Sequence, residues 1–201
     1  MNPKPIIADE RFVLRKFADY LKRGSGCNLW YKLNYSPGNR KLPISQPEID
    51  LIYGPIVNGS RYTPISAAEI KYIRVTKDRG ITHSYYAGLD EALALLRYGV
   101  DYALLIHLID IKLLEQSILS YPKTLHILIR NLKLPIGYRV YAVNTIHDVK
   151  FYTTLLRPQI DLKGLWIGAP QNPLLSENFE TCGLVNKFRK RIINNLKLRS
   201  H

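Results

Sequence analysis

The chain has 201 residues, of which 46% are hydrophobic and 22% are charged. This composition excludes a disordered tail, a collagen-like repeat and a coiled coil. Its 29 lysines and arginines outnumber its 16 aspartates and glutamates, so the net charge is +13. So large a positive charge on a small protein favours a polyanionic partner, above all nucleic acid. The length suits one domain, which we expect to span residues 1–201.

The cysteines do not indicate a metal site, and the apolar segments do not indicate a signal peptide or a membrane span. Cys27 and Cys182 have no cysteine or histidine at the spacing of a zinc site. Residues 1–7 lack the apolar stretch of a signal peptide. The apolar runs are too short to cross a bilayer. We therefore expect a soluble, intracellular protein with no membrane partner, located in the host cytoplasm if it is viral.

In the first half of the chain the sequence predicts two amphipathic helices and four strands. Val13, Phe17 and Leu21 recur at helical spacing, and Gly24 ends that run. Glycines, prolines and asparagines separate the short strand-like segments that follow. Gly99 closes a second amphipathic helix. The predicted elements are a helix over 8–23, strands over 30–35, 48–53 and 67–75, a helix over 89–98 and a buried strand over 102–108.

The second half is predicted to extend the sheet and to end in a basic helix. Residues 111–133 read as mostly helical, with a break around Pro122. Because strands alternate with helices only in this half, the pattern predicts an α/β fold with a mixed central sheet flanked by helices. The further predicted elements are a strand over 138–143, a short helix over 147–156, a short strand over 165–168 and a basic amphipathic helix over 179–198.

Three polar residues stand out on the predicted strands. Side chains two residues apart on a strand share a face, so Glu69 and Lys71 lie side by side among apolar neighbours. On the preceding strand, Ile49, Leu51 and Tyr53 point one way and Asp50 points the other. If the two strands pair through the turn between them, the Asp50 and Glu69 carboxylates meet.

Two adjacent carboxylates repel each other unless a cation lies between them. Carboxylate, carbonyl and water oxygens suit a hard divalent ion such as Mg²⁺ or Mn²⁺, and the Ile70 carbonyl is a further candidate ligand. Lys71 is then placed to orient or help deprotonate a metal-bound water, or to stabilise charge on a phosphate. Attack of a metal-activated water on a phosphodiester is the chemistry that this set predicts.

The string Pro47-Glu48-Ile49-Asp50, followed by Glu69-Ile70-Lys71, resembles the PD-(D/E)xK motif of the restriction-endonuclease-like nuclease superfamily. Eighteen residues lie between Asp50 and Glu69, a spacing that this superfamily tolerates. The resemblance covers roughly residues 8–110 and implies a core of helix, three strands, helix and strand. Residues 111–201 would then be a C-terminal extension. The abundance of lysine, isoleucine, leucine and tyrosine resembles that of small archaeal or archaeal-virus proteins.

The superfamily often adds an acidic residue from its first helix, and Glu10 is the candidate here. Glu10, Leu14, Phe17 and Leu21 fall on one line of the predicted helix, so Glu10 lies at the end of its core-facing stripe. An acid in that place needs a partner or a metal. The alternative is that Glu10 is a favourable charge in the first helical turn.

The function predicted from these residues is metal-dependent cleavage of DNA, with RNA left open, by Asp50, Glu69, Lys71 and Glu10. The resemblance implies products with 5′-phosphate and 3′-hydroxyl ends, and a homodimer that cuts both strands. The alternative is a non-catalytic nucleic-acid-binding module that keeps the nuclease-like fold. The residues expected to contact phosphate are Arg97, Lys187, Arg189, Lys190 and Arg191.

Overall fold

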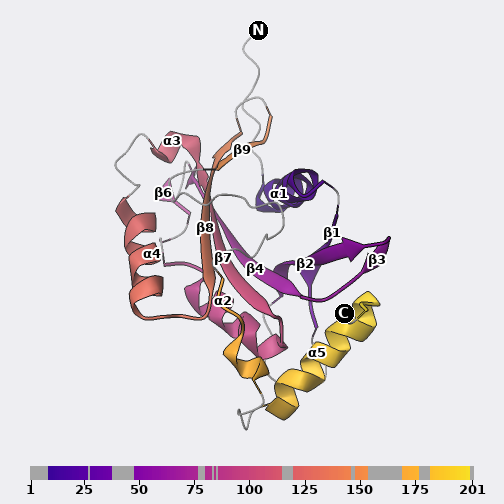
Figure 1. Ribbon diagram of the computed structural model, residues 1–201. Helices are drawn as coiled ribbons and strands as arrows, with labels where there is room; N and C mark the ends of the chain where they lie inside the picture. Colours follow the sequence, from indigo (N-terminus) through magenta and orange to yellow (C-terminus); the bar gives the residue numbers. More distant parts are fainter. Residues whose placement is uncertain are drawn as a thin grey trace.

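The computed structural model describes residues 9–26, 28–37, 48–76, 80–82, 84, 86–114, 120–145, 148–153, 169–176 and 182–199 (Figure 1). Within these ranges the chain forms five α-helices, two short 3-10 helices and nine strands. They are α1 (Glu10–Gly24), β1 (Leu29–Tyr35), β2 (Ile49–Val57), β3 (Ser60–Arg61), β4 (Ser66–Ile73), β5 (Val75–Thr76), β6 (Gly80–Ile81), α2 (Leu89–Ala94), η1 (Leu95–Tyr98), β7 (Tyr102–Asp110), α3 (Ile111–Leu114), α4 (Ser120–Asn131), β8 (Gly137–Asn144), β9 (Lys150–Thr153), η2 (Pro173–Leu175) and α5 (Cys182–Leu196).

The central sheet is mixed, as the sequence predicts. Its strands lie in the order β1-β2-β4-β7-β8-β9, and β3 pairs with β2 beside this path. The pairs β1–β2, β2–β4 and β8–β9 are antiparallel, whereas β4–β7 and β7–β8 are parallel. Leaving aside the two-residue strands β3, β5 and β6, the first part of the chain runs through α1, β1, β2, β4, α2 and β7, which is the predicted order of helix, three strands, helix and strand.

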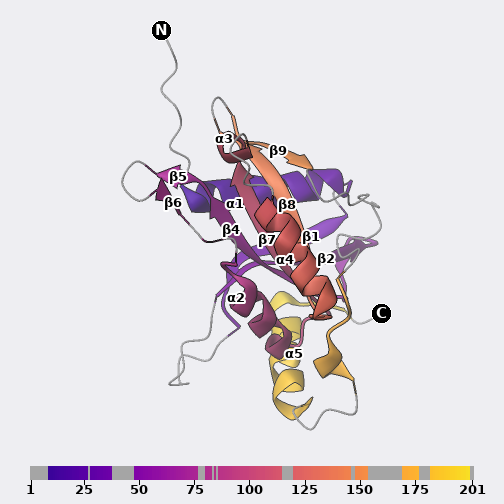
Figure 2. The same ribbon diagram turned by 90° about the vertical axis from the view of Figure 1, so that its left-hand side faces the viewer.

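Helices cover both faces of the sheet (Figures 1 and 2). The α1 stripe of Val13, Phe17 and Leu21 is buried against one face, together with side chains of β2, β4, β7 and β8. Residues of α2, α4 and α5 bury the other face. The central strands β4 and β7 are therefore buried on both sides, which explains why residues 102–108 form an almost continuous apolar run.

The structure corrects two predictions in the second half of the chain. Residues 150–153 form strand β9, which pairs with β8, where the sequence predicted a helix over 147–156. Hydrogen bonds along the β8 edge override the weak helical periodicity of this short segment. Pro122 lies in the first turn of α4 instead of breaking a helix, because first-turn N–H groups need no partner within the helix. The strand predicted over 165–168 lies outside the described residues.

None of the helices in the described part of the chain is long and apolar enough to cross a membrane.

An ion pair fixes α5 against the loop that precedes β7. Asp101 is 9% exposed. Its Oδ2 accepts hydrogen bonds from the Ile65 backbone N–H at 2.7 Å and from Arg189 Nη1 at 3.0 Å. Arg189 also donates to the Gly99 carbonyl at 2.6 Å. Asp101 therefore joins α5, the start of β7 and the residue before β4.

We expect Asp101→Ala to destabilise the protein strongly. The substitution leaves the buried Ile65 N–H without its acceptor and removes the partner of Arg189, which costs about 2–4 kcal/mol of the free energy of unfolding. Asp101→Asn keeps an acceptor oxygen and should cost roughly half as much. Urea denaturation of both variants measures the difference. Equal stability of Asp101→Ala and the wild type would contradict this assignment.

Candidate functional site

The candidate site lies where strands β2 and β4 separate. The two strands pair from Leu51–Ala68 to Tyr53–Ser66, and one further step along this register places Asp50 opposite Glu69. At this position the side chain of Asp50 replaces the β2 backbone as the hydrogen-bond acceptor, and its Oδ2 accepts the Ile70 N–H at 2.8 Å. The β2 backbone is therefore free to diverge from β4 at Asp50.

Asp50 and Glu69 bring two carboxyl groups together. Asp50 is partly buried, Glu69 is only 4% exposed, and each affects the pKa of the other. Burial, and next the negative charge of Asp50, raise the pKa of Glu69 to about 8. Burial also raises the pKa of Asp50, although the hydrogen bond from Ile70 opposes the shift. At neutral pH the pair therefore holds a proton that exposed carboxylates would release.

Lys71 is held by two acidic side chains. Its Nζ lies 2.7 Å from Glu69 Oε1 and 2.6 Å from Glu91 Oε2, on helix α2. Burial alone would lower the pKa of Lys71, but the hydrogen bonds to Glu69 and Glu91 raise it above its ordinary value. Lys71 therefore carries a fixed positive charge.

Sequence reasoning missed Glu91. The only signal was its place in the first turn of a predicted helix, where an acid usually reflects the helix dipole.

A buried histidine fixes the chain that leads into α2. His107 is fully buried, and its register partner on β4 is Lys71. Its Nε2 lies 3.1 Å from the Ala87 carbonyl, and its Nδ1 lies 2.9 Å from the Tyr138 hydroxyl. These contacts fit a neutral ring that donates to Ala87 and accepts from Tyr138. They hold the start of α2, and with it Glu91, close to Lys71.

We expect Gly88→Ala to disturb the placement of α2 over Lys71. Gly88 has φ +84°, and a Cβ there would lie 2.9 Å from Leu105 Cδ1 and 3.1 Å from Lys71 Cε. The backbone strain and the crowding together should cost about 2–4 kcal/mol of unfolding free energy. Gly59→Ala is the matched control, because Gly59 also has positive φ (+71°) but nothing within 4 Å of its Cβ position. If urea denaturation showed that Gly88→Ala and Gly59→Ala lose equal unfolding free energy, the crowding at Gly88 would contribute nothing, which would contradict this prediction.

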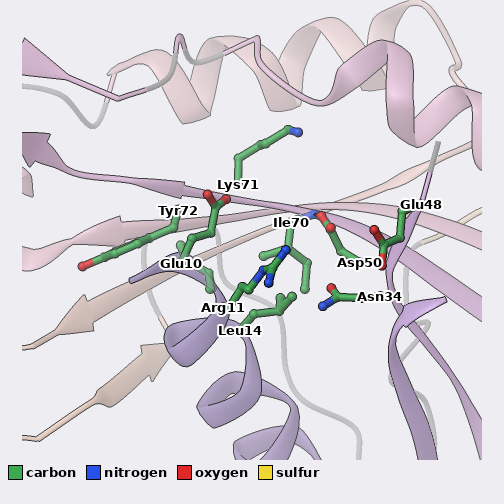
Figure 3. Close-up of a pocket in the computed structure, with 10 residues that line it drawn as sticks. Glu10, Arg11, Leu14, Asn34, Glu48, Asp50, Ile70, Lys71 and Tyr72 are labelled. Carbon is green, nitrogen blue, oxygen red and sulfur yellow. Dashed lines mark hydrogen bonds between the residues drawn. The ribbon is translucent and has the colours of Figure 1, made fainter. Parts of the chain in front are cut away.

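A pocket of about 240 Å³ opens beside the carboxyl pair (Figure 3). Asp50 and Glu48 lie on one side of it, and Glu10 and Arg11 of α1 lie on the other. The negative charge of Glu10 adds to the upward shift of the Asp50 pKa. Glu69 is not among the residues that line this pocket, and its carboxyl group pairs with Lys71. The remaining lining residues are Leu14, Asn34, Ile70, Lys71, Tyr72 and Leu108.

The structure brings some of the predicted ligands together and keeps others apart. Asp50 and Glu69 are in contact, and Ile70 lines the pocket beside them. Glu10 lines the same pocket but is exposed, because it begins α1 one turn before the buried stripe that starts at Val13 and Leu14. Among the described residues, no three or more histidine, cysteine, aspartate or glutamate side chains are grouped closely enough to hold a metal ion.

The predicted phosphate contacts fall into two classes. Arg97 on η1 and Lys187 and Lys190 on α5 are exposed. Arg189 and Arg191 have partners within the protein. Arg189 pairs with Asp101, and Arg191 donates to the Pro37 carbonyl at 3.2 Å. The three exposed residues are therefore the better placed of the five to meet a phosphate.

Comparisons with known proteins add one distant structural match. No family model matches the sequence, and no curated protein matches it. Among solved structures, the chain is similar to SfsA from Pyrococcus furiosus, solved in complex with Ca²⁺, with a TM-score of 0.41 and 11% sequence identity. The match covers 73% of this chain and 64% of that chain. At this level of similarity, function has to be inferred from the site residues.

Proposed function

We propose that this protein is a metal-dependent DNA endonuclease with a restriction-endonuclease-like core. The observation that carries the proposal is the buried Asp50–Glu69 carboxyl pair, which lies beside Lys71 where β2 and β4 separate. Asp50 accepts the Ile70 N–H and Glu69 pairs with Lys71, but these contacts do not require two carboxyl groups side by side, and their repulsion costs the fold stability that a bound cation would restore.

The donor atoms suit a divalent cation. Mg²⁺ and Mn²⁺ prefer oxygen ligands, and binding of such an ion would release the proton that the pair retains at neutral pH. Asp50, Glu69 and the Ile70 carbonyl would hold it, and Glu10 would add negative charge from across the pocket. A bound ion of this kind supplies a nucleophilic water at neutral pH and neutralises phosphate charge.

Lys71 and Arg11 are the positively charged residues that line the pocket, and the Lys71 ammonium group is directed to Glu69 and Glu91. Lys71 is protonated and held in place by Glu69 and Glu91, so it acts as a fixed cation and not as a base. It would stabilise negative charge that develops on a phosphodiester. Arg11 is exposed at the pocket, where it would contact the backbone of the substrate.

The charge of the whole protein supports a nucleic-acid substrate. A net charge of +13 attracts a polyanion over long distances, and the exposed Arg97, Lys187 and Lys190 would neutralise phosphates. Cleavage of both strands of a duplex would need two sites, which a homodimer supplies.

The experiment that tests the proposal is cleavage of a panel of labelled nucleic acids. Linear duplex, single-stranded DNA, flap, four-way junction, supercoiled plasmid and RNA would each be incubated with Mg²⁺, Mn²⁺ or EDTA. We expect cleavage of DNA with either metal and none with EDTA. The preferred substrate would identify the class of nuclease. Absence of cleavage under every condition would refute the proposal.

A second candidate is a nucleic-acid-binding module without catalysis. One observation favours it: in the part of the chain that the structure describes, Lys71 is engaged by Glu91 as well as Glu69, and no group of three ligands is assembled. Salt-sensitive binding of DNA with no cleavage in any metal would establish this second function.

A further inference from the structure

A second pocket, remote from the carboxyl pair in the chain, lies between α4 and the edge of β8. It has a volume of about 580 Å³. Helix α4 lies in front of β8 in Figure 2, and the segment at Pro170 completes the wall. Four basic residues line it, and we refer to this site as the basic pocket: His126, Arg130, Lys133 and Arg139.

The basic pocket brings Arg130, Lys133 and Arg139 together, and Arg139 also donates to the Tyr138 carbonyl at 3.2 Å. None of its lining residues is acidic. Arg130 and Lys133 are exposed, and within the described ranges neither forms an ion pair. Arg130 and Lys133 carry like charges on the wall of one pocket, and their repulsion costs the protein some stability. An anion bound among them would remove that cost.

Capping of α4 does not explain the basic residues. Lysine and arginine side chains near the C-terminus of a helix often donate hydrogen bonds to its last carbonyl groups. Here backbone N–H groups already do so, since Lys133 donates to Arg130 and Leu134 donates to Ile129, at 3.1 and 2.9 Å. Lys133 has the left-handed φ of 51° that this turn requires. The side chains of Arg130 and Lys133 are therefore available to a ligand.

We propose that the basic pocket binds the phosphate of a nucleotide. Arg130, Lys133 and Arg139 would hold the phosphate, and the apolar wall of Ile129 and Leu134 would contact the attached sugar or base. The volume falls within the range of small-molecule sites, which suits a single nucleotide. That nucleotide is either free or one unit of a polynucleotide chain, and binding measurements separate these two sources.

The test compares two charge reversals of equal size. R130E/K133E removes the basic pocket, and R61E/K112E is the matched control, because Arg61 and Lys112 are exposed and lie outside it. AMP and inorganic phosphate would be titrated calorimetrically, and a fluorescent single-stranded 12-mer would be followed by anisotropy. All titrations contain EDTA, which keeps the result independent of cleavage. We expect R130E/K133E to weaken binding about tenfold or more, and the control about threefold or less.

Each outcome of this test decides something. AMP binding that R130E/K133E abolishes supports the proposal and identifies a free nucleotide as the ligand. If R130E/K133E loses binding of the 12-mer alone, the proposal is also supported, and the phosphate belongs to a polynucleotide. Equal losses in R130E/K133E and the control would overturn the proposal, as would a wild type that binds none of the three probes. A positive result would stand even if the protein proved not to be a nuclease.

Discussion

Asp50→Asn and Glu69→Gln should each lower metal-dependent DNA cleavage at least about 100-fold. Each substitution replaces a charged oxygen donor with a neutral amide, and so removes the charge that would hold the metal. The amide oxygen of the Asp50→Asn variant can still accept the Ile70 N–H, so the separation of β2 and β4 is retained. The measurement is the initial rate of cleavage on the preferred substrate of the panel, with saturating Mn²⁺.

The matched control for these variants is Asp90→Asn, which makes the same kind of change at an exposed position of α2. We expect this variant to cleave at nearly the wild-type rate. Thermal unfolding of all three proteins verifies that they are folded. Retention of more than about a tenth of the activity by a folded Asp50→Asn would remove Asp50 from the proposed machinery.

The raised pKa of Glu69 predicts an unusual dependence of stability on pH. The pKa is near 4.3 in an unfolded chain and about 8 in the folded protein, so the folded protein binds the proton more tightly. The stability gained from that proton is complete below about pH 4 and is lost as the pH rises towards 8. Between pH 5 and pH 8, in EDTA, wild type should therefore lose roughly 2–4 kcal/mol relative to Glu69→Gln.

A divalent metal should reverse this trend. Mn²⁺ competes with the proton for the same carboxylates, so its stabilising effect should grow from pH 6 to pH 8 in wild type and be absent in Glu69→Gln. Urea denaturation at several pH values, with EDTA or with Mn²⁺, gives both results. Parallel stability curves for wild type and Glu69→Gln in EDTA would contradict the buried, proton-sharing pair.

The sequence predicted the fold better than it predicted the surroundings of the site. Periodicity identified α1 and the doubly buried β7, because both elements have strong apolar patterns. The period of two along β4 placed Glu69 beside Lys71, and the register of β2 brought Asp50 to them. By contrast, residues 150–153 form β9 because they pair with β8, and no local sequence pattern indicates that pairing.

Contacts between distant elements explain what the sequence could not reveal. Glu91 reaches Lys71 because the His107–Ala87 hydrogen bond positions α2, and neither pattern nor spacing encodes that contact. The engagement of Arg189 by Asp101 likewise depends on how α5 packs. The basic amphipathic helix predicted phosphate contacts for Lys187, Arg189, Lys190 and Arg191, although Arg189 and Arg191 are held within the protein.

The most direct measurement of the central claim is calorimetric titration of Mn²⁺ into the wild type at pH 8, with Asp50→Asn in parallel. The account predicts binding to the wild type that is lost in Asp50→Asn, together with proton release on binding, because the ion displaces the proton that Asp50 and Glu69 share. No binding to the wild type, or equal binding to both proteins, would contradict a metal site at the carboxyl pair and with it the proposed nuclease.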